Sequence, residues 1–114
     1  MHELSLAVGL VGEVEEILSR EGASRLLAVS VVIGVLSGVE CESFESAFQI
    51  VVEAMPSMAE AKLFVEREAV KVKCSSCGAV SPIKLPCVSC PGCASADVEV
   101  VAGRKFLIKS MEVE

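Results

Sequence analysis

The sequence contains no tryptophan or tyrosine, no glycine-rich phosphate loop, and only one histidine, which is residue 2. Acid–base catalysis commonly uses a histidine that an acidic partner orients, and nucleotide enzymes bind phosphates through glycine-rich loops. The single histidine here has no such partner within a recognisable motif. An enzyme is therefore the least favoured class of protein for this chain.

Basic residues are also scarce, with 10 lysines and arginines against 16 acidic residues and a net charge of −6. Nucleic-acid binding depends on clustered basic side chains, so a nucleic-acid partner is not expected. The longest apolar run, 26–39, is shorter than the roughly 20 residues that cross a bilayer, so membrane insertion is not expected either. The first residues lack the basic region of a signal peptide. These absences predict a cytoplasmic protein.

The hydrophobic pattern predicts two amphipathic helices. Apolar residues recur every three or four positions over 4–18 and again over 44–55. Gly22 follows the first helix and Pro56 follows the second, and both residue types commonly lie beyond helix ends. Ser43 is the expected N-cap of the second helix, because serine favours that position.

The remaining apolar runs predict strands and complete an α+β fold, with the two helices packed on a small mixed sheet. The run 25–36 is rich in valine and is expected to lie centrally in the sheet, with a bend at its glycine-containing end. A long strand is expected over 62–73. Two further strand-like runs, 97–101 and 104–114, are separated by Ala102-Gly103, a short turn signal. The expected domains are residues 1–73 plus 97–114, and an inserted metal-binding ribbon over 74–96.

Four of the six cysteines form two Cys-x2-Cys pairs. Cys74 and Cys77 make the first pair, and Cys90 and Cys93 make the second after twelve intervening residues. Two residues between cysteines let a tight turn direct both sulfurs at one ion, and the adjacent glycines and proline suit such turns. Four thiolates satisfy Zn(II) and leave no open coordination position. The spacing therefore predicts a structural zinc ribbon.

The sequence leaves other uses of the cysteines open. Two disulfides, free thiols of a redox protein, and an iron site of the same geometry are the alternatives, although a reducing compartment disfavours disulfides. Cys87 could pair with Cys90, but the proline and glycine that follow Cys90 favour its pairing with Cys93. Cys41 is expected to be a half-buried residue of small apolar character.

The N-terminal amine, the amide of residue 2 and the imidazole of His2 can form one short chelate. The amine and the amide close a five-membered ring, and the amide and the imidazole Nδ1 close a six-membered ring. Planar nitrogen donors suit Ni(II) or Cu(II) better than Zn(II). Glu3 could accept a hydrogen bond or supply an axial oxygen. A histidine at position 2 is otherwise an ordinary residue of a frayed terminus, and the residues alone leave both interpretations open.

The N-terminal Met1-His2-Glu3, together with the distal cysteine pairs, resembles the hydrogenase maturation nickel chaperone HypA (HybF) family. The other matching segments are Val32-Ile33-Gly34, Val39-Glu40, Ser43-Phe44 and Leu107-Ile108. The resemblance covers essentially the whole chain. The combination of both motifs is far more specific than either motif alone.

The resemblance implies a non-catalytic nickel metallochaperone with Ni(II) as its cargo and a structural Zn(II). His2 matches the nickel histidine, and the Met1 amine and adjacent amides match its helper ligands. Glu3 matches the acidic residue that follows the histidine, and Glu40 a position that is acidic in some relatives. The residues that match the zinc ligands are Cys74, Cys77, Cys90 and Cys93.

The same resemblance implies partners: the GTPase HypB, the large subunit of [NiFe] hydrogenase and, for some members, urease maturation proteins. The expected state is a monomer or a weak homodimer. Because the chain has no second histidine, a nickel geometry that uses a histidine from the zinc lobe is excluded. The alternative function is a zinc-ribbon interaction module without a nickel role, whose acidic surface binds a basic protein.

Overall fold

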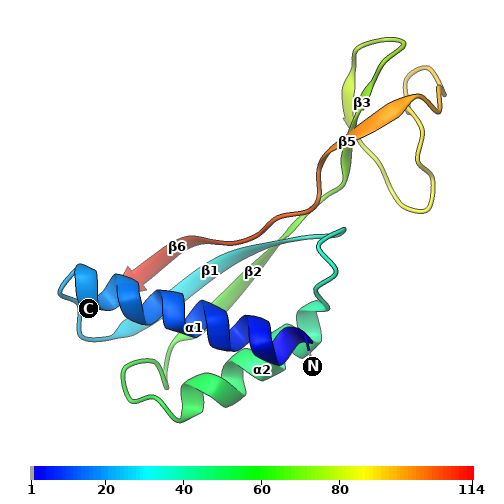
Figure 1. Cartoon of the computed structure of the whole chain (residues 1–114). Helices are drawn as coiled ribbons and strands as arrows, with labels where there is room; N and C mark the ends of the chain where they lie inside the picture. Colours follow the sequence, from blue (N-terminus) through cyan, green and yellow to red (C-terminus); the bar gives the residue numbers. More distant parts are fainter. Residues whose placement is uncertain (1) are drawn as a thin grey trace. The chain divides into compact units, whose positions relative to one another are not determined.

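The computed structural model describes residues 2–114, which form two helices and six strands (Figure 1). The elements in chain order are α1 (His2–Arg20), β1 (Leu26–Gly34), α2 (Cys41–Glu53), β2 (Lys62–Glu68), β3 (Lys71–Cys74), β4 (Val80–Pro82), β5 (Val98–Ala102) and β6 (Phe106–Val113). The predicted α+β class is confirmed.

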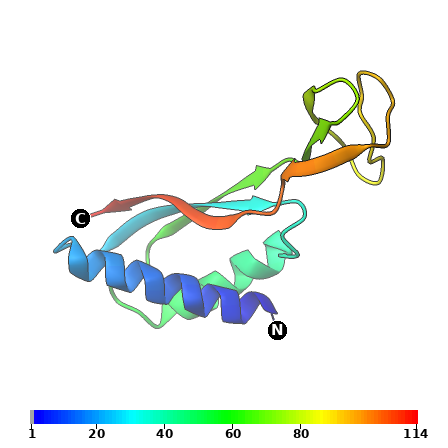
Figure 2. The ribbon, with the colours of Figure 1, turned by 45° about the horizontal axis from the view of Figure 1, so that its top comes forward.

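Both helices form where the apolar periodicity places them, and each buries one face. The buried residues of α1 are Ala7, Leu10, Val11, Val14 and Leu18. Helix α2 contacts α1 and buries Phe44 and Phe48 completely. In Figure 2 the two helices lie on the same side of the sheet formed by β1, β2 and β6. Neither helix of residues 2–114 is long and apolar enough to cross a membrane.

The first sheet has the strand order β2-β1-β6, so β1 is central, as its valine-rich sequence predicted. The amide of Glu114 donates to the carbonyl of Arg25, and the amide of Gly34 donates to that of Lys105, so β6 runs antiparallel to β1. Strand β2 runs in the same direction as β1 (Figure 1). The alternate residues Val29, Val31 and Ile33 have no exposed surface and contribute to the core.

The second sheet has the order β4-β3-β5, and both strand pairs are antiparallel. Val72, at the middle of β3, is buried opposite Ser81 and Val100. The described chain divides into two compact units. Unit 1 comprises residues 2–32, 39–66 and 107–114, and unit 2 comprises residues 33–38 and 67–106. Unit 2 therefore contains more of the chain than residues 74–96.

The prediction of one long strand over 62–73 is wrong, because β2 and β3 belong to different sheets. The carbonyl of Glu68 accepts a hydrogen bond from the amide of Val35, whereas the carbonyl of Val70 accepts one from the amide of Ile83. The backbone therefore changes its pairing partner within two residues. Three consecutive polar residues, 66–68, and then two apolar residues, 69–70, interrupt the alternation at this point, so the sequence pattern carried a signal of the break.

Strands β5 and β6, which lie on either side of Gly103, do not pair with each other but also belong to different sheets. The carboxylate of Glu68 binds the chain between them: its Oε1 accepts from the amides of Gly103 at 2.9 Å and Lys105 at 3.2 Å. Burial alone would raise the pKa of Glu68, but these amides outweigh that effect and hold the pKa below its ordinary value. An ionised side chain thus satisfies backbone donors that a hairpin would have paired.

The predicted N-cap of α2, Ser43, is incorrect. Glu40 has the extended backbone of an N-cap (φ −87°, ψ 116°), and its carboxylate accepts from the amides of Glu42 at 3.3 Å and Ser43 at 2.7 Å. The preference for short polar residues at N-caps favours Ser43 in the sequence. Glu40 instead accepts from amides three positions earlier in the chain than those that a serine cap at position 43 would reach, so the helix begins earlier than predicted.

Replacement of Glu40 by alanine should lower the free energy of unfolding by about 0.5–2 kcal/mol, the usual loss when an N-cap side chain is removed. Two amides at the start of α2 would lose their acceptor. Urea denaturation followed by helical circular dichroism measures the change. Glu45→Ala, at an exposed position within the same helix, should remain within about 0.5 kcal/mol of the original protein. Equal losses in both variants would contradict the capping role.

Candidate metal sites

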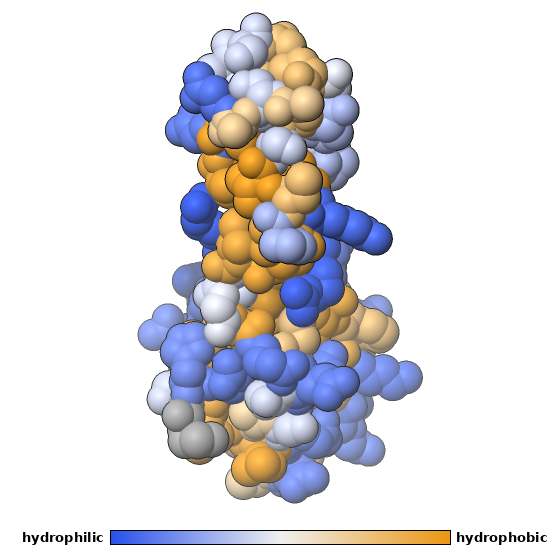
Figure 3. Space-filling view, turned by 90° about the vertical axis from the view of Figure 1, so that its right-hand side faces the viewer, coloured by the Kyte–Doolittle hydropathy of each residue, from blue (hydrophilic) through white to orange (hydrophobic). Residues whose placement is uncertain are grey.

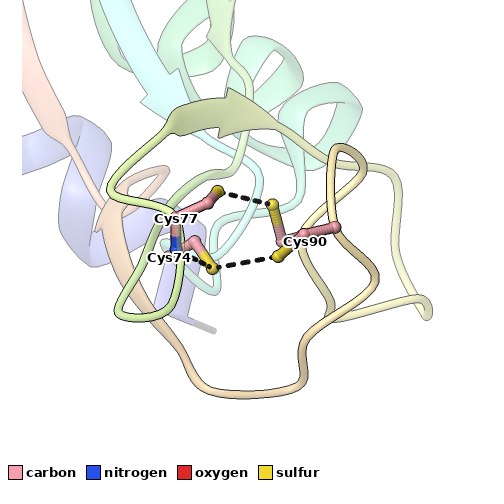
Figure 4. A group of neighbouring side chains, drawn as sticks. Cys74, Cys77 and Cys90 are labelled. Atoms are coloured by element: carbon pink, nitrogen blue, oxygen red, sulfur yellow. Dashed lines mark hydrogen bonds between the residues drawn. The ribbon is translucent and has the colours of Figure 1, made fainter.

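Four cysteine sulfurs come together in unit 2 (Figure 4). The sulfurs of Cys74, Cys77, Cys90 and Cys93 all lie within 4.8 Å of one another. The Cys74 and Cys93 sulfurs are 3.5 Å apart, and the Cys77 and Cys90 sulfurs are 3.6 Å apart. Within residues 2–114, no other set of three or more potential metal-ligating side chains gathers in this way.

These sulfur separations fit a tetrahedral metal site and not disulfides. A disulfide bond is about 2.05 Å long. Sulfurs placed about 2.3 Å from a central zinc ion lie about 3.8 Å from one another at the corners of a tetrahedron. The observed distances of 3.5 and 3.6 Å are close to the tetrahedral value, and each of the four cysteines is free. The donor set therefore fits a closed, four-coordinate ion.

Each cysteine pair is closed by the same backbone hydrogen bond. The amide of Gly78 donates to the carbonyl of Cys74 at 2.9 Å, and the amide of Ala94 donates to the carbonyl of Cys90 at 2.8 Å. Both donors have left-handed backbones, with φ of 75° for Gly78 and 63° for Ala94. Alanine pays a steric penalty there that glycine avoids. Sequence reasoning found the glycine but missed Ala94, which has the same role in the second pair.

Backbone amides favour the thiolate form of one cysteine in each pair. The amide of Cys77 donates to the sulfur of Cys74 at 3.4 Å and, against the effect of burial, lowers the pKa of Cys74 to about 6. The amides of Cys93 and Gly92 likewise lower the pKa of Cys90. Cys74 and Cys90 are also the buried members of their pairs. Metal binding requires thiolates, so both shifts favour metal binding at these positions, and protons compete increasingly as pH falls.

The two remaining cysteines lie outside this cluster. Cys87 is exposed, and its sulfur is 3.5 Å from the hydroxyl of Ser89. The alternative in which Cys87 joins Cys90 at the metal is not the arrangement in the structure. Cys41 is half-buried at the first position of α2, in agreement with its expected small apolar character.

The second candidate site lies at the start of α1. His2 is the first residue of the helix, and its side chain is 61% exposed. Its Nδ1 lies 3.6 Å from Oε2 of Glu3. The predicted ligand amine belongs to Met1, which lies outside the described residues. The structure thus shows an accessible imidazole beside a carboxylate.

Glu3 also connects α1 to the beginning of α2. Its Oε2 accepts a hydrogen bond from the amide of Glu40 at 3.2 Å, and this bond is the main reason that the pKa of Glu3 is lowered. Glu40 in turn caps α2 through its own side chain. The family resemblance had singled out both acids, but a contact between residues 37 positions apart could not be read from their spacing.

The chain is similar over its whole length to proteins of one family. The family model described as hydrogenase/urease nickel incorporation, metallochaperone, HypA matches residues 1–113. Hydrogenase maturation factors HypA from Chlorobium limicola and Aquifex aeolicus are each 37% identical over 115 residues; the matches cover all of this chain and 97% and 98% of theirs.

Two solved structures show the same similarity in three dimensions. The solution structure of the Ni metallochaperone HypA from Helicobacter pylori matches with a TM-score of 0.69 and 28% identity, over 97% of this chain and 96% of that one. A second solution structure of a HypA protein matches with a TM-score of 0.73 and 30% identity, over 100% and 97% of the two chains. The similarity therefore includes both compact units.

Proposed function

The chain belongs to the HypA family, and we propose that it is a nickel metallochaperone that binds Ni(II) at Met1-His2-Glu3 and delivers the ion for maturation of [NiFe] hydrogenase. The observation that carries this proposal is the exposed imidazole of His2 beside the carboxylate of Glu3. Nitrogen donors suit Ni(II), and an accessible ligand lets an acceptor remove the ion.

The surroundings of His2 support a site that attracts a cation. Glu3 is tied to the amide of Glu40, which keeps its carboxylate next to the imidazole, and its lowered pKa keeps it ionised near neutral pH. A fixed negative charge favours the approach of a divalent cation. We propose that Glu3 positions the nickel histidine and that Glu40 positions Glu3.

We infer that the four-cysteine cluster holds Zn(II) as a structural ion. Four thiolates would enclose it and leave no coordination position open for transfer or catalysis. In zinc-finger peptides such an ion contributes apparent binding free energies of about 10–16 kcal/mol, which is also folding free energy. Cys74, Cys77, Cys90 and Cys93 would thereby stabilise unit 2.

We further propose that the protein acts in the cytoplasm as a carrier and not as an enzyme. The GTPase HypB and the hydrogenase large subunit are the proposed partners, with urease maturation proteins as further recipients. The family description, which names both hydrogenase and urease nickel incorporation, supports this assignment.

Replacement of His2 by alanine should weaken Ni(II) binding by more than about 100-fold. Loss of a group that orients a metal ligand typically costs about 10–100-fold in affinity, and loss of the ligand itself should exceed that range. Glu3→Gln should fall within it. Calorimetric titration of the zinc-loaded protein measures both, with Glu16→Ala, an exposed acid further along α1, as the control.

Unchanged nickel affinity in the His2 variant would refute this site. That result would favour the zinc-ribbon interaction module, particularly if blocking the N-terminal amine also had no effect. Zinc content should be one ion per chain in all variants, because the cysteine cluster contains neither His2 nor Glu3.

A further inference from the structure

Unit 2 contains an apolar groove that neither metal site uses. It has a volume of about 300 Å³, and its lining residues are Val35, Ala69, Val70, Ile83, Lys84 and Leu85. Val35 is 41% exposed and Leu85 is 44% exposed, although both are large aliphatic residues. Solvent-exposed aliphatic side chains around a concave surface are typical of a site that binds another molecule.

The walls of the groove are held by backbone hydrogen bonds. The amide of Val35 donates to the carbonyl of Glu68 at 3.0 Å, and the amide of Ile83 donates to the carbonyl of Val70 at 2.9 Å. The carbonyl of Lys84 accepts from the amide of Cys87 at 3.1 Å. The groove is therefore largely formed before a partner binds, which reduces the entropy lost on binding.

Figure 3 shows the side of the molecule that carries the chain after β1 and the loop after β4. Apolar surface is gathered there in a continuous band, with hydrophilic side chains on both sides. Val88, in the same loop as Leu85, is also exposed. An apolar centre with a polar rim is the usual composition of a protein interface.

The charge of unit 2 differs in sign from that of the whole chain. Unit 1 contains thirteen acidic and four basic residues, whereas unit 2 contains three acidic and six basic residues. One of those three acids, Glu68, is already paired with Lys105 at 3.5 Å. The groove itself is lined by Lys84 and by no acidic residue. Its charge therefore complements a negatively charged ligand.

We propose that this groove docks a segment of a partner protein that carries aliphatic side chains flanked by carboxylates. Aliphatic side chains would bury the surfaces of Val35 and Leu85, and a carboxylate would pair with Lys84. A nucleic acid fits less well, because the lining offers one cation and no aromatic side chain for base stacking. The acidic surface of unit 1, by contrast, repels such a segment, so docking is directed to unit 2.

The test uses the two partners named by the proposed function, purified HypB and the hydrogenase large-subunit precursor, with zinc-loaded protein. Lys84→Glu and Leu85→Asp should each weaken binding of at least one partner by 10-fold or more. Lys73→Glu, an exposed lysine of β3 outside the groove, should stay within about 2-fold. Lys84 is itself exposed, so its replacement leaves the core of unit 2 intact.

The proposal is overturned if neither partner binds the original protein, or if both groove variants bind as well as the Lys73 control. Binding of a single-stranded oligonucleotide that Lys84→Glu abolishes, without any effect on the two proteins, would also overturn it. Nickel titration of the Lys84 variant should match that of the original protein. Failure of the nickel site is thereby distinguished from failure of the groove.

Discussion

Cys90→Ala should abolish tight zinc binding and unfold unit 2, while helices α1 and α2 remain formed. Cys90 is only 2% exposed, and its sulfur lies 3.6 Å from that of Cys77 within the cluster. Three thiolates leave zinc with an open position and a weaker site. The other buried apolar side chains of unit 2 are few: Ile33, Val70, Val72 and Cys74. Without the ion, so small a core is not expected to offset the entropy of ordering the chain.

Elemental analysis and amide NMR spectra measure this effect. The zinc content should fall from one ion per chain to none, and the dispersed resonances of residues 67–106 should collapse while those of both helices persist. Cys87→Ala is the matched control, because Cys87 is exposed and lies outside the cluster. If Cys87→Ala lost zinc and Cys90→Ala retained it, the assignment of the ligands would be wrong.

Gly34→Ala should lower the free energy of unfolding by more than about 4 kcal/mol, a loss that few single substitutions reach. A Cβ atom on Gly34 would lie 2.1 Å from the carbonyl oxygen of Gly103 and 2.8 Å from the amide nitrogen of Arg104. These are backbone atoms and cannot rotate away. The chain would have to move, which would break the hydrogen bond from the amide of Gly34 to the carbonyl of Lys105.

Gly12→Ala is the same chemical change, but it should raise the stability of the protein where Gly34→Ala lowers it. Gly12 lies within α1, and a Cβ atom there meets nothing within 4 Å. Alanine is the better helix former by roughly 0.8–1 kcal/mol, so this variant should be more stable than the original protein. Urea denaturation of both variants measures the contrast. If both substitutions changed the free energy of unfolding by similar amounts, the backbone of residues 103 and 104 would not lie as close to Gly34 as the structure has it.

Several features of the fold were predictable because their signals are local. The three- and four-residue periodicity of apolar side chains located α1 and α2, and the valine-rich run located β1. Gly34 was expected at a bend, but the reason for a glycine there is a contact with Gly103, which lies far along the chain. The N-cap of α2 was misassigned because residue preference outweighed the reach of Glu40.

The candidate sites also contain some features that the sequence predicted and others that it did not. The spacing of the cysteine pairs is local and identified the four sulfurs that the structure brings together. The hydrogen bond between Glu3 and the amide of Glu40 joins two helix starts, and no sequence signal marks it. The groove near Lys84 combines residues from three separate segments and was not visible in the sequence either.

The sequence by itself thus determined the two helices, the scarcity of catalytic groups, the paired cysteines and the resemblance to one family. The excess of acidic residues, which argued against a nucleic-acid partner, holds for the chain as a whole and not for unit 2. Most of the acidic residues belong to unit 1. Only the tertiary structure decided which sheet each strand joins, where Glu3 is anchored and which surface is basic. These features depend on pairings between distant residues, and such pairings are selected by packing and backbone hydrogen bonding rather than by local pattern.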